Sequence, residues 1–179
     1  MPEFLLPDTT ELRNFGSVDQ LSLLKEFLGQ RGRVVAAVAH EIRASIHRVP
    51  AIGRIDLKEW FGAEVEIDDI DDSQRVDVLR TTVFGGTARN QMQHLGESQT
   101  LFVIMNRPEF TGSTWITDDG EAFRYAKKKG ILTLHTRGVL EALVSRGELS
   151  AQSAFELCEK MQEADRDLLD PPRSSRDFT

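Results

Sequence analysis

A short β-rich run meets a helix in the segment Ser113-Thr114-Trp115-Ile116-Thr117-Asp118-Asp119-Gly120-Glu121-Ala122. The run ends at Ile116, and residues 121–129 have the composition of a helix. Two carboxylates therefore stand at the carboxyl end of a strand. Open parallel α/β sheets bind ligands at this edge, because the following helices direct their positive ends toward it. A simpler interpretation is also open, in which Asp119 caps the helix and Asp118 lies in solvent.

Three further acids follow predicted strands or open predicted helices. Asp8 comes directly after an apolar strand at residues 4–6. Glu41 opens a helix after residues 33–39, an apolar run without alternation that predicts a strand buried on both faces. Glu97 falls in the first turn of another predicted helix. We expect these three acids and the pair after Thr117 to gather at one edge of the sheet.

Strands alternate with helices along the chain, which predicts a parallel sheet packed between helices. The predicted strands are residues 4–6, 33–39, 63–67, 113–116 and 131–134. The predicted helices are residues 18–28, 40–46, 57–61, 73–83, 94–105, 121–129, 136–146 and 151–167. The first of them is inferred from a capping-box pattern at Ser17 and Gln20. We expect one domain over residues 1–168 and a mobile polar tail at residues 169–179.

Composition limits the class of protein. The formal charge of −7 gives no general attraction to nucleic acid, so such binding would need a local basic patch or bridging metal ions. Cys158 is the only cysteine, which excludes an internal disulfide and a cysteine-based metal site, and it is expected to be a small buried residue. The sequence has no signal-peptide pattern and no apolar run of ~20 residues, so we expect a cytoplasmic protein that does not enter a membrane.

The acids predict a metal site. Carboxylates that share a partly dry pocket repel one another unless a cation neutralises them. All-oxygen ligands suit Mg²⁺ or Mn²⁺, which can orient a water and stabilise the charge that develops on a phosphodiester. A bridging metal would also explain how an acidic protein engages RNA. Thr9 or Thr10, together with Thr117, could hydrogen-bond the carboxylates or a metal-bound water.

The order and spacing of these pieces resemble the PIN domain, the fold of many Mg²⁺- or Mn²⁺-dependent ribonucleases and of the toxins in prokaryotic toxin–antitoxin pairs. The resemblance covers residues 4–167. It rests on Asp8-Thr9-Thr10 after the first strand, Glu41 after the second, the helix start Leu95-Gly96-Glu97-Ser98, the segment 117–122, and a late strand followed by paired helices. It implies an α/β fold built as a three-layer α/β/α sandwich with a central, mostly parallel sheet.

The resemblance also implies site residues, residue by residue. The first metal-binding acid of the family matches Asp8, the second Glu41 and the third Glu97, and the fourth matches Asp118 or Asp119, which the sequence does not separate. These residues would hold Mg²⁺ or Mn²⁺ for hydrolysis of an RNA phosphodiester. The further implied partners are an antitoxin or another protein, and a second copy of the chain in a homo-oligomer.

One alternative belongs to a different class, namely a PIN-like fold without turnover that binds nucleic acid or protein. Several arginines come from segments that could flank the acidic edge and contact phosphate, although solvated surface is the commoner role for each. They are Arg43, Arg48, Arg54 and Arg89.

Overall fold

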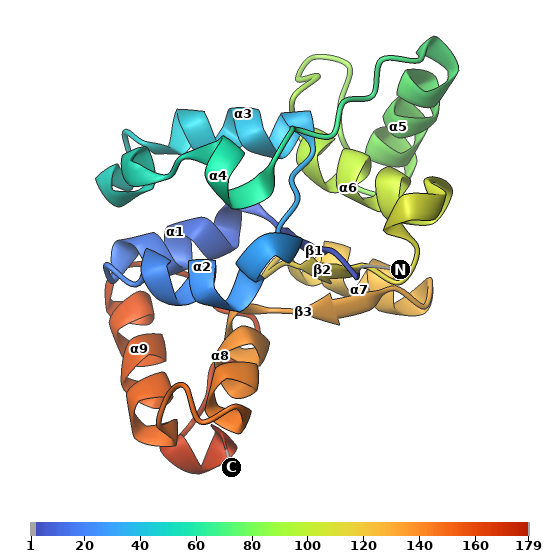
Figure 1. The fold of residues 1–179 in the computed structure, drawn as a ribbon. Coiled ribbons are helices and arrows are strands. Elements are labelled where there is room, and N and C mark those ends of the chain that lie inside the picture. The colour runs from blue at the N-terminus through green and yellow to red at the C-terminus, as the bar shows by residue number, and fades with distance from the viewer. Residues whose placement is uncertain (1–2, 179) are drawn as a thin grey trace.

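The structure, a computed structural model, describes residues 3–178 and is a mixed α/β fold (Figure 1). Its sheet has three strands in the order β1-β2-β3, namely β1 (Leu5–Pro7), β2 (Thr114–Ile116) and β3 (Leu132–Leu134). Both neighbouring pairs are parallel, and Trp115 at the centre lies opposite Leu6 and Thr133. Because the strands are parallel, their carboxyl ends meet at one edge of the sheet. The α/β class and the parallel sheet are therefore as predicted.

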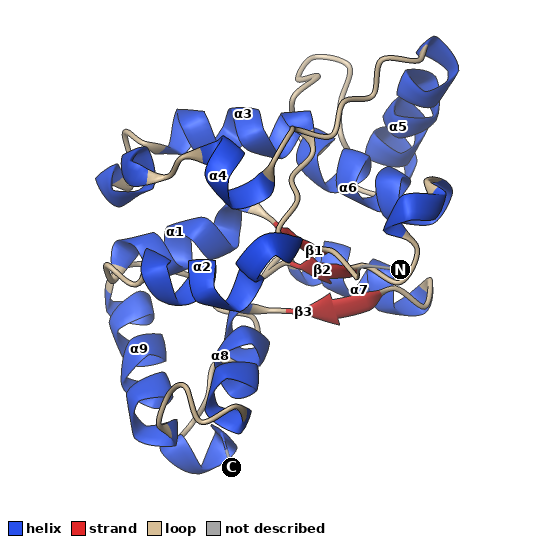
Figure 2. Cartoon of the chain, in the orientation of Figure 1, coloured by secondary structure: helices blue, strands red, loops and turns tan. Residues whose placement is uncertain are grey.

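Helices surround this small sheet (Figure 2). The helices of the described residues are α1 (Thr9–Ser17), α2 (Leu21–Leu28), α3 (Ala36–Ser45), α4 (Leu57–Phe61), α5 (Ile70–Thr82), α6 (Leu95–Asn106), α7 (Gly120–Lys128), α8 (Thr136–Ser145) and α9 (Ala151–Glu163). The connection from β1 to β2 contains α1 to α6, whereas α7 alone joins β2 to β3. In Figure 1 the pair α8 and α9 extends away from the sheet, and the pair α5 and α6 lies at the opposite end of the molecule. The predicted helices at residues 94–105 and 121–129 are confirmed.

The predicted strand at residues 33–39 is wrong, because α3 begins at Ala36. The chain ahead of α3 makes only isolated parallel bridges, one of which pairs Val35 with Val65. The strand predicted at residues 63–67 is therefore also wrong, since this single bridge is all that forms there within the described part of the chain. Alanine has the highest helix propensity, and this run contains three alanines. A backbone N–H in the first turn of α3 also donates to the side chain of Gln99 at 3.0 Å, which satisfies one of the amides left free there. An apolar run can form either element, and the tertiary contact favours the helix.

The first helix of the chain was not predicted, whereas the helix predicted at residues 18–28 is present as α2. Asp8 and Glu11 form a capping box, in which the Asp8 carboxylate accepts from the backbone of the first turn and the Glu11 carboxylate accepts from the Asp8 N–H. The helix α1 therefore starts at Thr9, directly after β1. The capping box predicted at Ser17 and Gln20 is wrong, since Gln20 precedes α2 without a side-chain hydrogen bond.

The core lies between the sheet and its helices. The largest fully buried side chains include Trp115, Phe15, Phe61 and Phe102. Cys158 is buried as predicted, and burial raises the pKa of its thiol to about 12, so this thiol stays protonated at neutral pH. Within residues 3–178, none of the helices combines the length and the apolar character needed to cross a membrane.

The described part of the expected mobile tail has defined contacts. Residues Ser175–Phe178 form a 3-10 helix, η4, that packs against α9 and α8. Phe178 is buried, and Asp177 accepts hydrogen bonds from the backbone N–H groups of Arg173 and Ser174 at 2.6 and 3.3 Å. The polar composition of the segment gave no sign that Phe178 would be buried. Here the structure differs from the sequence expectation.

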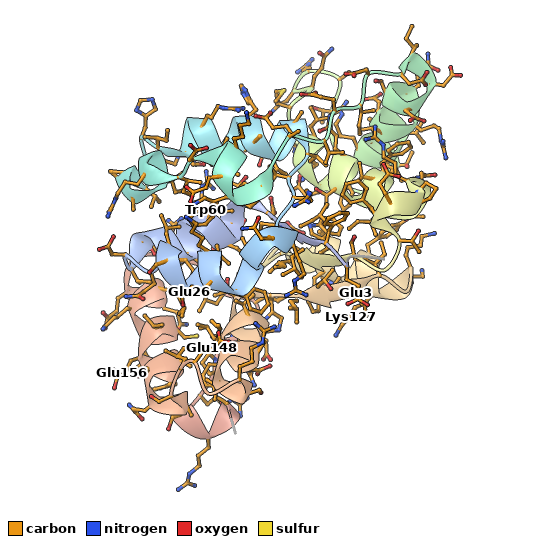
Figure 3. The ribbon with its side chains drawn as sticks, in the orientation of Figure 1. Glu3, Glu26, Trp60, Lys127, Glu148 and Glu156 are labelled. Atoms are coloured by element: carbon orange, nitrogen blue, oxygen red, sulfur yellow. The ribbon has the colours of Figure 1, made fainter. Side chains whose placement is uncertain are left out.

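Most acidic side chains lie on the outside. Glu26, Glu148 and Glu156 are all exposed, and Figure 3 shows Glu156 on the outer side of α9. Among the described residues only two acids are buried, Asp8 at 7% exposure and Glu11 at 0%. Water solvates the exposed acids. The two buried acids near the end of β1 lack this solvation, so their burial needs another reason.

A candidate acidic site

Asp8 is held at the junction of β1 and α1. Its backbone N–H donates to the carbonyl of Ile116 at 2.9 Å, which joins the ends of β1 and β2. Its Oδ1 accepts from the N–H of Thr9 at 2.7 Å, and its Oδ2 has a longer contact of 3.4 Å from the Thr117 hydroxyl. The carboxylate is therefore fixed by both adjacent strand ends, as predicted for an acid at the carboxyl edge of the sheet.

Glu41 reaches this edge from α3. Its Oε2 accepts from the hydroxyl of Thr9 at 2.9 Å. Its Oε1 lies so close to the start of α6 that a Cβ on Gly96 would be only 2.8 Å away. Gly96 thus makes room for the Glu41 carboxylate. The expectation that Glu41 lies in a first helical turn is wrong, because α3 starts at Ala36 and Glu41 is its sixth residue.

Glu97 approaches from α6. It lies in the first turn of that helix, as predicted, and its side chain is 16% exposed. Its Oε1 is 3.3 Å from Nδ1 of His94, which precedes the helix in a left-handed backbone conformation. An acid in the first turn interacts favourably with the positive end of the helix dipole.

The two adjacent acids after β2 have different roles. Asp119 caps α7, because its Oδ1 accepts from the N–H groups of Glu121 and Ala122 at 2.9 and 2.7 Å. Its own N–H donates to the hydroxyl of Thr117 at 3.1 Å, so the same threonine contacts Asp8 and Asp119. The simple interpretation that Asp119 caps the helix is confirmed.

Asp118 is not in solvent, as that interpretation would have it. It accepts from Asn14 Nδ2 at 2.8 Å, from the hydroxyl and N–H of Thr136, and from the N–H of Leu169 at 3.1 Å. These donors come from α1, α8 and the segment after α9. Asp118 therefore connects three parts of the chain to the end of β2, and both of its oxygens are occupied.

The pKa shifts divide the acids into two groups. Burial raises the pKa of Asp8 well above its usual value, and the charges of Glu97, Glu41 and Asp119 raise it further. Burial likewise raises the pKa of Glu41, with a further contribution from Glu97. Asp8, Glu41, Glu97 and Asp119 thus form one electrostatic group, which we call the acidic cluster.

Asp118 belongs to a second group behind this cluster, together with an acid that the sequence interpretation missed. Burial raises the pKa of Glu11 well above its usual value, with further contributions from Asp118 and Asp8. Glu11 Oε1 and Asn14 Oδ1 are both buried and have no hydrogen-bond partner among the described residues. The signal that could have identified Glu11 was its spacing of three residues from Asp8, which is the spacing of a capping box.

The carboxylates approach one another but do not form a ready-made metal site. Within residues 3–178, no three His, Cys, Asp or Glu side chains are arranged to hold one ion. The acidic cluster nevertheless lies at the carboxyl edge of the sheet, where Asp8, Glu41, Glu97 and Asp119 interact electrostatically. Asp118 lies behind it and interacts with Glu11. The oxygen donors and the mutual repulsion of the acidic cluster fit a hard divalent cation such as Mg²⁺ or Mn²⁺. Binding one would require the carboxylates to turn toward it.

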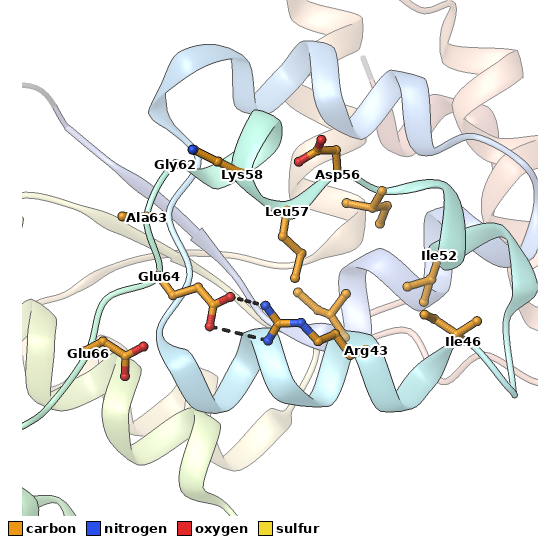
Figure 4. A pocket seen from close by; sticks show the side chains of 13 residues that line it. Arg43, Ile46, Ile52, Asp56, Leu57, Lys58, Gly62, Ala63, Glu64 and Glu66 are labelled. Carbon is orange, nitrogen blue, oxygen red and sulfur yellow. Dashed lines mark hydrogen bonds and ion pairs between the residues drawn. The ribbon is translucent and has the colours of Figure 1, made fainter.

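The four candidate arginines differ in whether their charge is paired with an acid. Arg43 is paired with Glu64 across an open pocket beside α3, as Figure 4 shows, so its charge is already engaged. Arg54 pairs with Asp19 at 2.8 Å. Arg48 and Arg89 are exposed and have no ion pair with the described acids. Of the four, Arg48 is the one whose charge affects the pKa of Arg13. Arg13 also interacts electrostatically with Glu41 and Asp8.

No protein-family model matches the chain, and neither a curated protein nor a solved structure matches it.

Proposed function

We propose that this protein is an endoribonuclease of the PIN type that depends on Mg²⁺ or Mn²⁺. The single observation that carries the proposal is the burial of Asp8 beside Glu41, Glu97 and Asp119. Burying a carboxylate next to like charges destabilises a fold unless the acid is protonated or a cation is bound. Helix capping and the helix dipole account for Asp8, Asp119 and Glu97 one by one. They do not account for Glu41 beside these acids, at the edge where parallel α/β sheets bind ligands.

Each residue has a role in this proposal. Asp8 would be the central ligand, since its Oδ2 has only the long contact to Thr117. Glu41 and Glu97 would turn toward the ion from α3 and α6, and Asp119 would contribute the oxygen that does not cap α7. Asp118 would instead act behind the site by fixing the end of β2. A bound divalent ion supplies a Lewis acid that lowers the pKa of water and offsets charge on the phosphodiester.

The hydroxyls of Thr9 and Thr117 would orient the carboxylates. Thr9 donates to Glu41 at 2.9 Å, and Thr117 contacts Asp8 while accepting from the N–H of Asp119. Hydrogen bonds of this kind around metal ligands limit their rotation and tune their basicity. The same threonines keep the acidic cluster together when no ion is present.

The finer description of the fold is part of the proposal. In addition to the three strands β1-β2-β3, isolated parallel bridges pair Leu5 of β1 with Gly32 and Val35 with Val65. These bridges support a central sheet wider than three strands, with helices on both of its faces. A three-layer α/β/α sandwich of the PIN type is the architecture that we propose.

The test is cleavage of a single-stranded RNA by the purified protein with and without Mn²⁺ or Mg²⁺. Cleavage should require the ion, should stop with a chelator, and should be lost in Asp8→Asn. Asp68→Asn is the matched control, because Asp68 is exposed and lies outside the acidic cluster. Equal cleavage by wild type and a folded Asp8→Asn variant would remove the proposed role of Asp8.

A second candidate function is a PIN-like binding module without turnover. The observation that favours it is that the acids do not form a ready-made set of three ligands among the described residues. Such a module would bind RNA or a partner protein and give no cut product in any metal. A toxin restrained by an antitoxin would be the first function with a protein partner added, and co-purification with the product of an adjacent gene would support it.

A further inference from the structure

Three arginines from distant parts of the chain lie near one another, and Arg13, one of them, also interacts with two acids of the acidic cluster. Arg13 comes from α1, Arg48 from the turn after α3, and Arg166 from the segment after α9. The charges of Arg48 and Arg166, after burial, lower the pKa of Arg13, whereas Glu41 and Asp8 raise it. Arg13 is thus close to both groups. We call Arg13, Arg48 and Arg166 the arginine cluster.

The arginine cluster has no acidic partner. None of the three makes an ion pair with an acid in the described part of the chain, although Arg54 nearby is paired with Asp19. Arg13 donates from Nε to the buried hydroxyl of Ser45 at 3.1 Å. That bond fixes the base of the Arg13 guanidinium and leaves its two terminal nitrogens without a hydrogen-bond partner among the described residues.

The arginines adjoin an open groove. A cavity of about 410 Å³ is lined by Arg48, Arg54 and Arg166 together with Gly16 and Ala164. Among the described residues, the only acid along its wall is Asp19, which is paired with Arg54. The groove is therefore positive, although the protein as a whole carries a formal charge of −7.

Arg48 and Arg166 line the groove without an ion-paired acid among the described residues, and neighbouring cations repel one another. Arg13 interacts with these two arginines and also with Glu41 and Asp8, so it connects the positive groove with the negative site. A polyanion cannot approach a bare acidic site without repulsion, and a row of cations next to it offsets that repulsion. Arginine is suited to the task because its planar fork matches the oxygens of a phosphate.

We propose that Arg13, Arg48 and Arg166 bind the phosphate backbone of single-stranded RNA and lead it to the acidic cluster. That the RNA runs toward the acidic cluster rests on the proposed function. Binding of the RNA by the three arginines does not require cleavage. Arg48 and Arg166 would contact phosphates along the groove. Arg13 would contact the phosphate next to the one at Asp8. Contacts of this kind hold the backbone without reading the bases, so binding should be insensitive to sequence.

The experiment measures binding of a labelled single-stranded RNA by fluorescence anisotropy in EDTA, where no metal-dependent cleavage occurs. Arg48→Ala and Arg166→Ala should each weaken binding on the order of tenfold at low salt. Each should also make the slope of log K against log salt shallower by about 0.7, the value for one phosphate contact on a single strand. Arg48→Lys keeps the charge and should keep most of the slope.

Lys128→Ala is the matched control. Lys128 is exposed, makes no ion pair with the described acids, and lies at the end of α7 away from Asp119. It should leave both the affinity and the slope unchanged. Thermal unfolding of each variant verifies that the fold is retained. Inorganic phosphate at the same ionic strength should compete poorly, since one phosphate cannot span the groove.

Three outcomes overturn the proposal: wild type that does not bind RNA at low salt, arginine variants that bind as wild type does, or an equal loss in Lys128→Ala. The outcome for the nuclease is separate. If RNA binding depends on Arg48 and Arg166 but the wild type never cleaves, the RNA groove stands and the catalytic function falls. If the wild type cleaves while the arginine variants bind normally, the nuclease stands and the groove falls.

Discussion

Asn14 and Asp118 are hydrogen-bonded although 104 residues separate them in the chain, with Asn14 Nδ2 lying 2.8 Å from Asp118 Oδ2. The same amide nitrogen donates to the hydroxyl of Thr136 at 2.9 Å. Through these contacts α1, the end of β2 and the start of α8 are fixed relative to one another. This network lies directly behind the acidic cluster, so its integrity determines where Asp8 and Asp119 stand.

Loss of the Asn14 amide should destabilise the fold. Asn14→Ala leaves the half-buried Asp118 with one donor fewer, which costs about 1–3 kcal/mol. For a chain of this size the melting temperature should fall by about 2–4 °C per kcal/mol. Asn90→Ala is the control, since Asn90 is exposed and only its backbone is hydrogen-bonded. An unchanged melting temperature in Asn14→Ala would show that the network does not hold these elements.

Stability without metal should fall as the pH rises. The folded-state pKa values of Asp8, Glu11 and Glu41 are raised, mainly by burial, so the folded state binds more protons than the unfolded state above the usual pKa values of about 4. The stabilisation that these acids provide is complete below those values and is lost as the pH passes through the raised folded values. Urea unfolding at pH 5 and pH 8 with a chelator present measures this loss.

Asp8→Asn should reduce that pH dependence. Asparagine keeps a side-chain oxygen that can cap α1 but carries no charge. The variant should therefore be more stable than wild type at pH 8, with a smaller difference at pH 5. Asp68→Asn changes the net charge equally at an exposed position and should follow the wild-type curve. If Asp8→Asn also follows it, the pKa of Asp8 is not raised.

A divalent cation should stabilise the folded protein. Binding to the folded state alone adds about 2.7 kcal/mol when the ion is at 100 times its Kd. Titration with Mn²⁺ should therefore raise the melting temperature of wild type and of Asp68→Asn, but have little effect on Asp8→Asn. Calorimetric titration gives the number of ions bound. Equal stabilisation of all three proteins would place the ion elsewhere.

Gly96→Ala should disturb the site more than the fold. Alanine is the better helix former, which favours α6 by up to ~1 kcal/mol. Its Cβ, however, would lie 2.8 Å from Glu41 Oε1 and 3.0 Å from Val38 Cγ2, so the Glu41 carboxylate must move. We expect weaker Mn²⁺ binding at a melting temperature within a few degrees of wild type. Gly53→Ala, where the nearest contact would be 3.3 Å from Ile46, should bind Mn²⁺ normally.

Local chemistry in the sequence was enough to predict much of the scaffold. The transition from Ile116 to Gly120 carries its own signals: a β-rich run, a threonine, and an acid that can accept from the free N–H groups of a helix. That pattern predicted β2 and α7, and it left open the simpler interpretation in which Asp119 caps α7. It could not separate the roles of Asp118 and Asp119, because the donors that occupy Asp118 come from α1, α8 and the segment after α9.

Two further features depended on contacts that no local pattern contains. The run at residues 33–39 is apolar enough for a strand or a helix, and the side chain of Gln99 helps to fix the helix. The arginine cluster joins positions 13, 48 and 166, which share no motif. Sequence alone therefore determined which residues could form strands, caps and an acidic edge, since these follow from neighbours along the chain. Tertiary structure alone decided which charges meet and which stay unpaired, because charge interactions depend on distance in space.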